Sequence, residues 1–143
     1  MLFAYSDASV KGNIGVATTF IVTEDTFITC FSKTYGNVSS SVEVELLGVV
    51  QTMEYIYEHC KHERMVVLLM DNKSIAVRYI KMLSNWRVPK VTDFRAHYEN
   101  LLEMSKGFVI NIQHIRGHQH THNPNKICDV LSKVCLSYSK GGK

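Results

Sequence analysis

Hydrophobic and polar residues along the first 35 positions are arranged in the manner of β-strands. An apolar strand begins at residues 2–5, and residues 15–22 and 26–35 are rich in Thr, Phe, Ile and Val, which strands prefer. A Gly- and Asn-containing turn follows the first strand, and residues 23–25 form a loop short enough for a hairpin. The pattern predicts three consecutive antiparallel strands.

The spacing of apolar residues then changes to three or four positions, which is typical of amphipathic helices. Residues 43–60 show this spacing first, after serines that can supply an N-cap. Residues 65–70 (MVVLLM) form an unbroken apolar run, as expected of a central strand covered on both faces. Two further helices reach residue 107, a strand follows at 108–115, and a last helix begins at Asn123-Pro124.

The predicted order of elements is β-β-β-α-β-α-α-β-α, which indicates an α/β fold. We expect a five-stranded mixed sheet, in which three antiparallel strands are followed by two parallel additions, with helices on both faces. The length of 143 residues suits a single domain over 1–143, with residues 139–143 as a flexible tail.

Composition narrows the class of protein further. A hydrophobic content of 45% and a charged content of 20% are ordinary for a soluble globular chain. No apolar run is long enough to span a membrane, and the N-terminus reaches acid and turn residues too soon for a signal peptide. The four cysteines are scattered, which favours reduced thiols. We expect a cytoplasmic monomer with no membrane partner.

Charge is unevenly distributed along the chain. Residues 1–72 hold four Lys or Arg against nine Asp or Glu, whereas residues 73–98 hold six against one. An acidic part that can hold cations beside a basic part that can hold a polyanion indicates a metal-dependent nucleic-acid enzyme. A solvated basic helix face explains the second part equally well.

Four acids are candidates for a shared site. A carboxylate near the middle of a buried strand, as at Asp7, is costly unless it is paired, hydrogen-bonded or bound to a metal. Asp71 ends the central strand, and the carboxyl ends of parallel strands meet at one edge of the sheet. Glu45 would reach this edge from the start of its helix, and Asp129 from the last helix.

Clustered carboxylates suit Mg²⁺ or Mn²⁺, because hard oxygen ligands leave room for water and phosphate. Two such ions can activate a water and stabilise the leaving oxygen of a phosphodiester. Each acid taken alone has a simpler explanation: Asp71 as a turn residue, Glu45 as a partner of the helix dipole, and Asp129 as a solvated helix residue. Their coincidence with this order of elements favours the site.

Several segments resemble type 1 ribonuclease H. D-A-S-V-K-G-N-I-G at residues 7–15 resembles the D-G-S-x-x-G-N-x-G opening of that family. V-E-V-E-L-L at 42–47 resembles its first-helix acid segment, and L-L-M-D-N at 68–72 its third-acid strand. H-I-R-G-H at 114–118, followed by N-K-I-C-D at 125–129, resembles its terminal segment. The resemblance covers nearly the whole chain in order and in approximate spacing.

The resemblance implies an endonuclease that cuts the RNA strand of RNA–DNA hybrids and leaves 3′-hydroxyl and 5′-phosphate ends. Asp7, Glu45, Asp71 and Asp129 would bind the metal ions, two per site in the substrate complex. Glu43 is the rival to Glu45, which sits directly before the apolar run as the family's acid does. His118 would be the loop histidine that helps to position water or release product.

Substrate contacts are also implied. Gly12 and Asn13 match family positions near the RNA strand, and Asn72 and Asn125 are further candidates, with plain surface polarity as the alternative. The family commonly has paired Asn before the helical Glu, whereas this chain has Ser41-Val42. Ser40 and Ser41 can still offer hydroxyls to a phosphate.

Trp86 follows Asn85 at the spacing of the family's DNA-channel tryptophan. It would stack on the DNA strand, or alternatively be buried against Phe94 or Tyr98. The basic protrusion of longer family members is reduced here to residues 87–91, so Arg87 and Lys90 are the candidate cations. Weak, steeply salt-dependent binding of long hybrids is expected.

Three alternatives remain at this point. Zinc binding by His114, His118, His120 and His122 with Cys128 is disfavoured, because alternating histidines lack the spacing of closed zinc sites. A nuclease or strand-transferase of the same fold could act on DNA or structured RNA. A non-catalytic hybrid-binding module is the third alternative, and the presence of all four acids argues against it.

Overall fold

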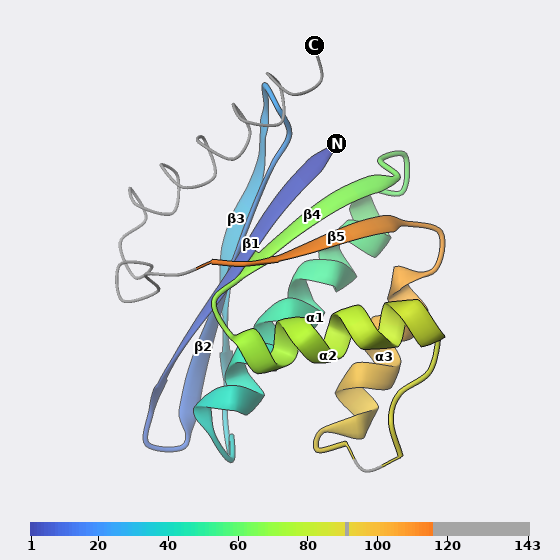
Figure 1. Cartoon of the computed structure of the whole chain (residues 1–143). Coiled ribbons are helices and arrows are strands. Elements are labelled where there is room, and N and C mark those ends of the chain that lie inside the picture. The colour runs from blue at the N-terminus through green and yellow to red at the C-terminus, as the bar shows by residue number, and fades with distance from the viewer. Residues whose placement is uncertain (91, 116–143) are drawn as a thin grey trace.

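The computed structural model describes residues 1–90 and 92–115, which form a five-stranded sheet and three helices (Figure 1). The first eight elements follow the predicted order β-β-β-α-β-α-α-β, whereas the helix predicted from residue 123 and the tail at 139–143 lie outside the described residues. The elements are β1 (Leu2–Lys11), β2 (Ile14–Val22), β3 (Phe27–Tyr35), α1 (Ser41–His59), β4 (Met65–Met70), α2 (Lys73–Asn85), α3 (Arg95–Ser105) and β5 (Val109–His114).

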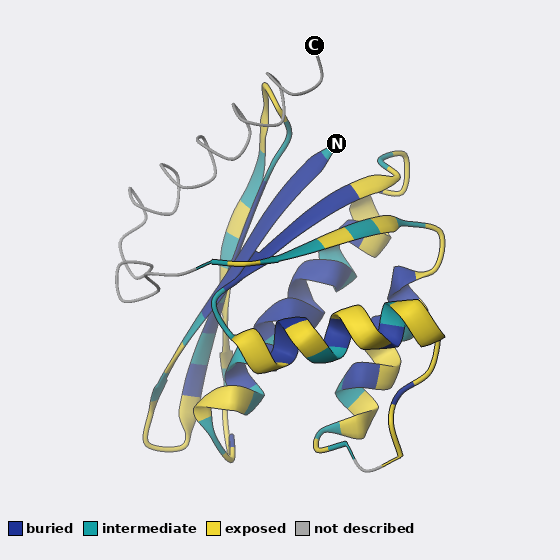
Figure 2. Ribbon diagram, in the orientation of Figure 1, coloured by how far each residue is buried: buried dark blue, intermediate teal, exposed yellow. Residues whose placement is uncertain are grey.

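The sheet has the strand order β3-β2-β1-β4-β5. β1, β2 and β3 are antiparallel neighbours, and β4 and β5 add in parallel to β1. The predicted mixed sheet is therefore confirmed. β1 and β4 lie at its centre, and both carry buried side chains on either face, which explains the unbroken apolar run of β4 (Figure 2).

The three described helices pack on one face of the sheet, where they share a single core with β1 and β4. Among them, α1 contributes Leu46, Met53 and Ile56, all fully buried. The opposite face carries a second apolar cluster centred on Phe3 and Leu69. Helices on both faces were predicted, and the helix predicted from residue 123 lies outside the described residues.

β1 is longer than the sequence indicated, because its polar second half pairs with β2 up to Lys11 and Ile14. Gly12 and Asn13 make the two-residue turn, and the φ of Gly12 is +65°, a conformation that glycine adopts without steric cost. Asp7 lies near the middle of this strand, as the sequence indicated, and two residues beyond the last pair of β1 with β4. The helix predicted to end near residue 107 was expected to include Phe94. Phe94 instead precedes α3 as its N-cap, with a φ of 59°.

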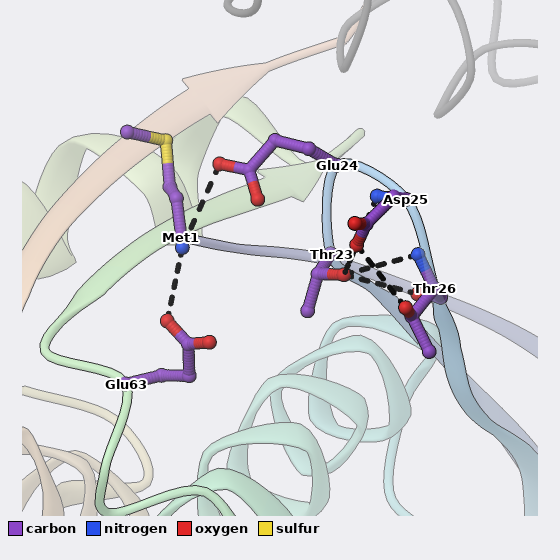
Figure 3. A network of polar contacts seen from close by, with 6 residues as sticks. All are labelled: Met1, Thr23, Glu24, Asp25, Thr26 and Glu63. Carbon is purple, nitrogen blue, oxygen red and sulfur yellow. Dashed lines mark hydrogen bonds and ion pairs between the residues drawn. The ribbon is translucent and has the colours of Figure 1, made fainter.

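The start of β1 is fixed by charge. The ammonium group of Met1 lies 2.9 Å from Glu63 Oε2 and 3.6 Å from Glu24 Oε1 (Figure 3). Burial alone would lower the pKa of this ammonium, but its hydrogen bond to Glu63 and the attraction of both carboxylates outweigh burial and raise the pKa above its ordinary value. The contacts tie β1 to the loops before β3 and before β4.

Candidate active site

Asp7 and Asp71 reach the same edge of the sheet from neighbouring parallel strands. Tyr5 of β1 is in register with Leu69 of β4, and each acid lies two residues beyond its member of that pair. Asp7 is 8% exposed and pairs with Thr18 of β2 on its other side. The strand register therefore brings the two carboxylates to one level.

Glu45 comes to this edge from the second turn of α1. The helix crosses the sheet closely at Gly48, where an added Cβ would lie 3.4 Å from the Ala17 Cβ and 3.7 Å from the backbone oxygen of Asp7. Three residues further along α1, Gln51 Nε2 donates to the backbone oxygen of Ala17 at 3.0 Å. Because Gly48 has no side chain, α1 lies against β1, and Glu45 projects beside Asp7.

The three acids line one small recess, which has room for about one water molecule. It lies just beyond the last pair of β1 with β4, between the second and third turns of α1 and the first turn of α2. Its walls are formed by Ser6, Asp7, Glu45, Val49, Met70, Asp71, Asn72 and Ile75.

Asn72 links this recess to α2 through both ends of its side-chain amide. Its Oδ1 accepts a hydrogen bond from the backbone N–H of Ile75 at 3.0 Å and thereby caps α2. Its Nδ2 donates a short hydrogen bond to Glu45 Oε2. The sequence offered Asn72 only as a substrate contact, and this link to Glu45 was missed because no local pattern relates residues 27 positions apart.

Glu43 and Glu45 have different surroundings. Glu43 Oε1 accepts hydrogen bonds from the backbone N–H and the hydroxyl of Ser39, at 2.7 and 3.2 Å. The backbone N–H of Glu43 donates to the N-cap hydroxyl of Ser40 at 3.2 Å. Glu43 thus takes part in capping α1, while Glu45 faces the recess.

The donor chemistry of the recess fits a divalent cation of the Mg²⁺ class, since carboxylate oxygens dominate it. Within residues 1–90 and 92–115, no three His, Cys, Asp or Glu side chains already stand as a group that could hold one ion. Asp129, His118 and Asn125 lie outside the described residues, as do His120, His122 and Cys128. His114 ends β5, where its Nε2 lies 2.9 Å from the backbone oxygen of Asp71.

The two residues that the resemblance places near the RNA strand lie on one hairpin turn, which contacts a neighbouring loop. Gly12 and Asn13 form the exposed tip of the β1–β2 hairpin. Asn13 Nδ2 donates to Asn37 Oδ1 at 3.3 Å, and its backbone oxygen accepts from Val38 N–H at 3.0 Å. The hairpin tip is therefore held against the loop that leads into Ser40 and Ser41. Asn37, which sequence reasoning did not single out, has a φ of 54° at this contact.

Trp86 lies at the C-terminal end of α2 in a left-handed conformation, with φ 53° and ψ 39°. Its side chain is 52% exposed, so it is not buried against Phe94 or Tyr98 as the alternative reading would require. Arg87 and Lys90 follow it and are also exposed.

Membrane-spanning character is not found in the described part of the chain: no helix there combines the length and apolar character needed to cross a bilayer.

Comparison with solved structures finds the same fold in ribonucleases H. RNase H1 from the halophilic archaeon Halobacterium salinarum superposes with a TM-score of 0.66 at 18% identity, covering 95% of this chain and 97% of that one. The N-terminal RNase H domain of Rv2228c from Mycobacterium tuberculosis gives a TM-score of 0.68 at 17% identity, covering 87% and 93% of the two chains. LC11-RNase H1, solved in complex with an RNA/DNA hybrid, gives 0.67 at 12% identity, covering 87% and 92%.

The comparison with curated protein sequences found no match. The sequence model of the RNase H family, by contrast, matches residues 1–136, which is nearly the entire chain. Together with the strand order and the shared recess of three acids, this match assigns the family. The chain belongs to the RNase H family.

Proposed function

We propose that this protein is a metal-dependent endonuclease that hydrolyses the RNA strand of RNA–DNA hybrids and leaves 3′-hydroxyl and 5′-phosphate ends. The observation that carries the proposal is the convergence of Asp7, Glu45 and Asp71 on one recess at the carboxyl end of β4, where its pairing with β1 stops. Family membership and the hybrid-bound relative LC11-RNase H1 support the choice of substrate.

The residues of the recess have distinct parts in this proposal. Asp7 and Asp71, fixed by adjacent strands, would hold Mg²⁺ or Mn²⁺ from two sides, with Glu45 and Asp129 each completing the ligands of one ion. Two bound ions would supply an activated water and stabilise the leaving oxygen. An ion would compete with Asn72 Nδ2 for the carboxylate of Glu45, whose Oε2 accepts a hydrogen bond from that amide. His118 is proposed to assist water positioning or product release.

Substrate discrimination is assigned to the loops that flank the recess. The tip formed by Gly12 and Asn13 is proposed to contact the RNA strand, with Ser40 and Ser41 beside it. A 2′-hydroxyl reached across a wide minor groove is what distinguishes RNA from DNA. Trp86, Arg87 and Lys90 are proposed to bind the DNA strand by stacking and charge. We expect the enzyme to act as a monomer in the cytoplasm.

A cleavage assay on one labelled RNA strand tests the proposal, with that strand paired in turn with DNA and with RNA, and with a duplex DNA control. Cleavage of the hybrid alone, dependent on Mg²⁺ or Mn²⁺, is the expected result. Equal cutting of all three duplexes would instead identify a nuclease that ignores the 2′-hydroxyl.

Asp71→Asn separates catalysis from binding, because the amide is isosteric and lacks the negative charge. We expect this variant to lose cleavage while it retains its fold and its affinity for the hybrid. Like-charge repulsion in the recess is also reduced, so its stability without metal should equal or exceed that of the wild type. An unchanged cleavage rate would refute the assigned site, and a wild-type chain that binds hybrids without cutting them would be a binding module.

A further inference from the structure

The loop of residues 86–90, which replaces the long basic protrusion, presents three exposed side chains of different kinds. Trp86 is followed by Arg87, and Lys90 closes the segment. The loop is attached to α2 at its start, where Trp86 N–H donates to the backbone oxygen of Met82 at 2.7 Å. At its middle, the side chain of Val88 is 8% exposed and joins the helix-side core.

Packing does not hold the remainder of this loop. A groove of about 590 Å³ lies between the loop and the outer face of α3. Trp86 and Val88 line it from the loop, and Leu102 and Lys106 line it from the helix. Beyond Val88, the backbone oxygens of Pro89 and Lys90 make polar contacts.

Arg95, the first residue of α3, provides those contacts. Its Nη1 donates to the backbone oxygen of Pro89 at 2.9 Å and lies 3.4 Å from that of Lys90. Its Nε donates to Glu99 Oε1 at 2.7 Å, one helical turn further along α3. The carbonyl of Pro89 also accepts from the hydroxyl of Thr92 at 2.8 Å. One guanidinium therefore bonds the end of the loop and the helix at the same time.

We propose that Arg95 is a positioning residue: it fixes the 86–90 loop on α3 so that Trp86, Arg87 and Lys90 are presented together to the DNA strand of the substrate. Glu99 orients the guanidinium for this task. The Pro89 carbonyl and the Glu99 carboxylate are bonded from two different nitrogens, Nη1 and Nε, whose directions one plane fixes, and the single nitrogen of a lysine ammonium cannot occupy both positions. The role in substrate binding rests on the proposed function, whereas the fixing of the loop does not.

A simpler role for Arg95 would be direct contact with a phosphate. The two roles give different results for Arg95→Lys, which keeps the charge and loses the planar guanidinium. A phosphate contact would be largely preserved by lysine, whereas the loop contact would be lost in Arg95→Lys as in Arg95→Ala. Lys61→Ala is the matched control for the loss of one charge, since Lys61 lies over the ring of Tyr57, beyond the C-terminal end of α1.

Trp86 is the only tryptophan of the chain, so its fluorescence reports the loop without any activity measurement. We expect lower Trp86 anisotropy and stronger iodide quenching in both Arg95 variants than in the wild type and in Lys61→Ala. Glu99→Gln, which keeps an acceptor for Nε, should resemble the wild type. Unchanged anisotropy in Arg95→Ala and Arg95→Lys would overturn the proposal.

Hybrid binding in the Asp71→Asn background gives the second readout. Both Arg95 variants should raise Kd by about five- to tenfold, the effect of losing one or two net hydrogen bonds. With Asp71 intact, KM should rise by a similar factor while kcat at saturating hybrid changes little. Wild-type affinity in Arg95→Lys, with a salt dependence reduced only in Arg95→Ala, would instead show a phosphate contact and overturn the positioning role. Failure of the wild type to bind hybrid would refute the proposed function, while Trp86 anisotropy would still decide whether Arg95 fixes the loop.

Discussion

Asn72 offers a quantitative test of how the recess is built, because its two hydrogen bonds can be removed separately. Asn72→Ser keeps an oxygen that can cap α2 and removes the amide that donates to Glu45. Asn72→Ala removes both. A bond to an ionised acceptor is worth about 1.5–3 kcal/mol when well shielded. Glu45 and Asn72 are only partly buried, so we expect about 1–2 kcal/mol for the amide.

The cap contributes separately. Loss of an N-cap side chain costs about 1 kcal/mol. Without divalent cations, we therefore expect the free energy of unfolding of Asn72→Ser to be about 1–2 kcal/mol below that of the wild type. That of Asn72→Ala should be lower by about 1 kcal/mol more. Urea unfolding followed by circular dichroism measures these differences as shifts of the midpoint at constant slope.

A double-mutant cycle with Glu45→Ala isolates the pair itself. Contacting side chains show interaction energies of about 0.5–3 kcal/mol in such cycles, whereas independent sites add. Mg²⁺ should stabilise Asn72→Ser more than the wild type, because the amide no longer competes for the oxygen of Glu45. If Asn72→Ser unfolded at the wild-type urea concentration and the cycle gave additivity, the amide would not hold Glu45 and the account of the recess would be wrong.

Two further predictions concern the frame around the site. Gly15→Ala would place a Cβ in steric overlap with Val44 Cγ2, so the first turns of α1 must shift. We expect the free energy of unfolding in urea to fall by about 1–3 kcal/mol and kcat to decrease. A variant of wild-type stability and rate would show that α1 adapts freely. The raised pKa of the Met1 ammonium contributes stability below the ordinary pKa of the group, near 8.0, and this contribution is lost as pH rises through the higher folded-state pKa. An N-acetylated chain lacks the charge that Glu63 and Glu24 attract. Between pH 7 and 10, its unfolding midpoint should therefore fall less than that of the unmodified chain. Parallel curves for the two chains would contradict this assignment.

The sequence predicted the order and type of the described elements because their apolar spacing is unambiguous. The run at β4, for example, has six unbroken apolar residues, a length typical of a strand covered on both faces. The end of β1 was missed because the residues beyond Asp7 alternate between partly buried and exposed positions, and their strand conformation depends on pairing with β2.

The candidate site was predictable in its acids and not in its supports. Asp7, Glu45 and Asp71 stand out by charge at the ends of apolar segments, and the structure brings them to one recess. Their catalytic and metal-binding roles remain predictions. Two contacts depend on side-chain directions that one-dimensional patterns do not contain. They are the hydrogen bond between Asn72 and Glu45 and the hydrogen bonds of the Arg95 guanidinium.

The parallel register of β1 with β4 also has a kinetic consequence. β1 and β2 meet through a two-residue turn, whereas β1 and β4 pair only when a stretch of chain that includes β3 and α1 has closed into a loop. Long-range parallel pairing is intrinsically slow, because closure entropy is lost before contacts compensate for it. Asp7 and Asp71 can therefore meet only after this closure, and a nascent chain that has not yet produced β4 carries Asp7 and Glu45 without Asp71.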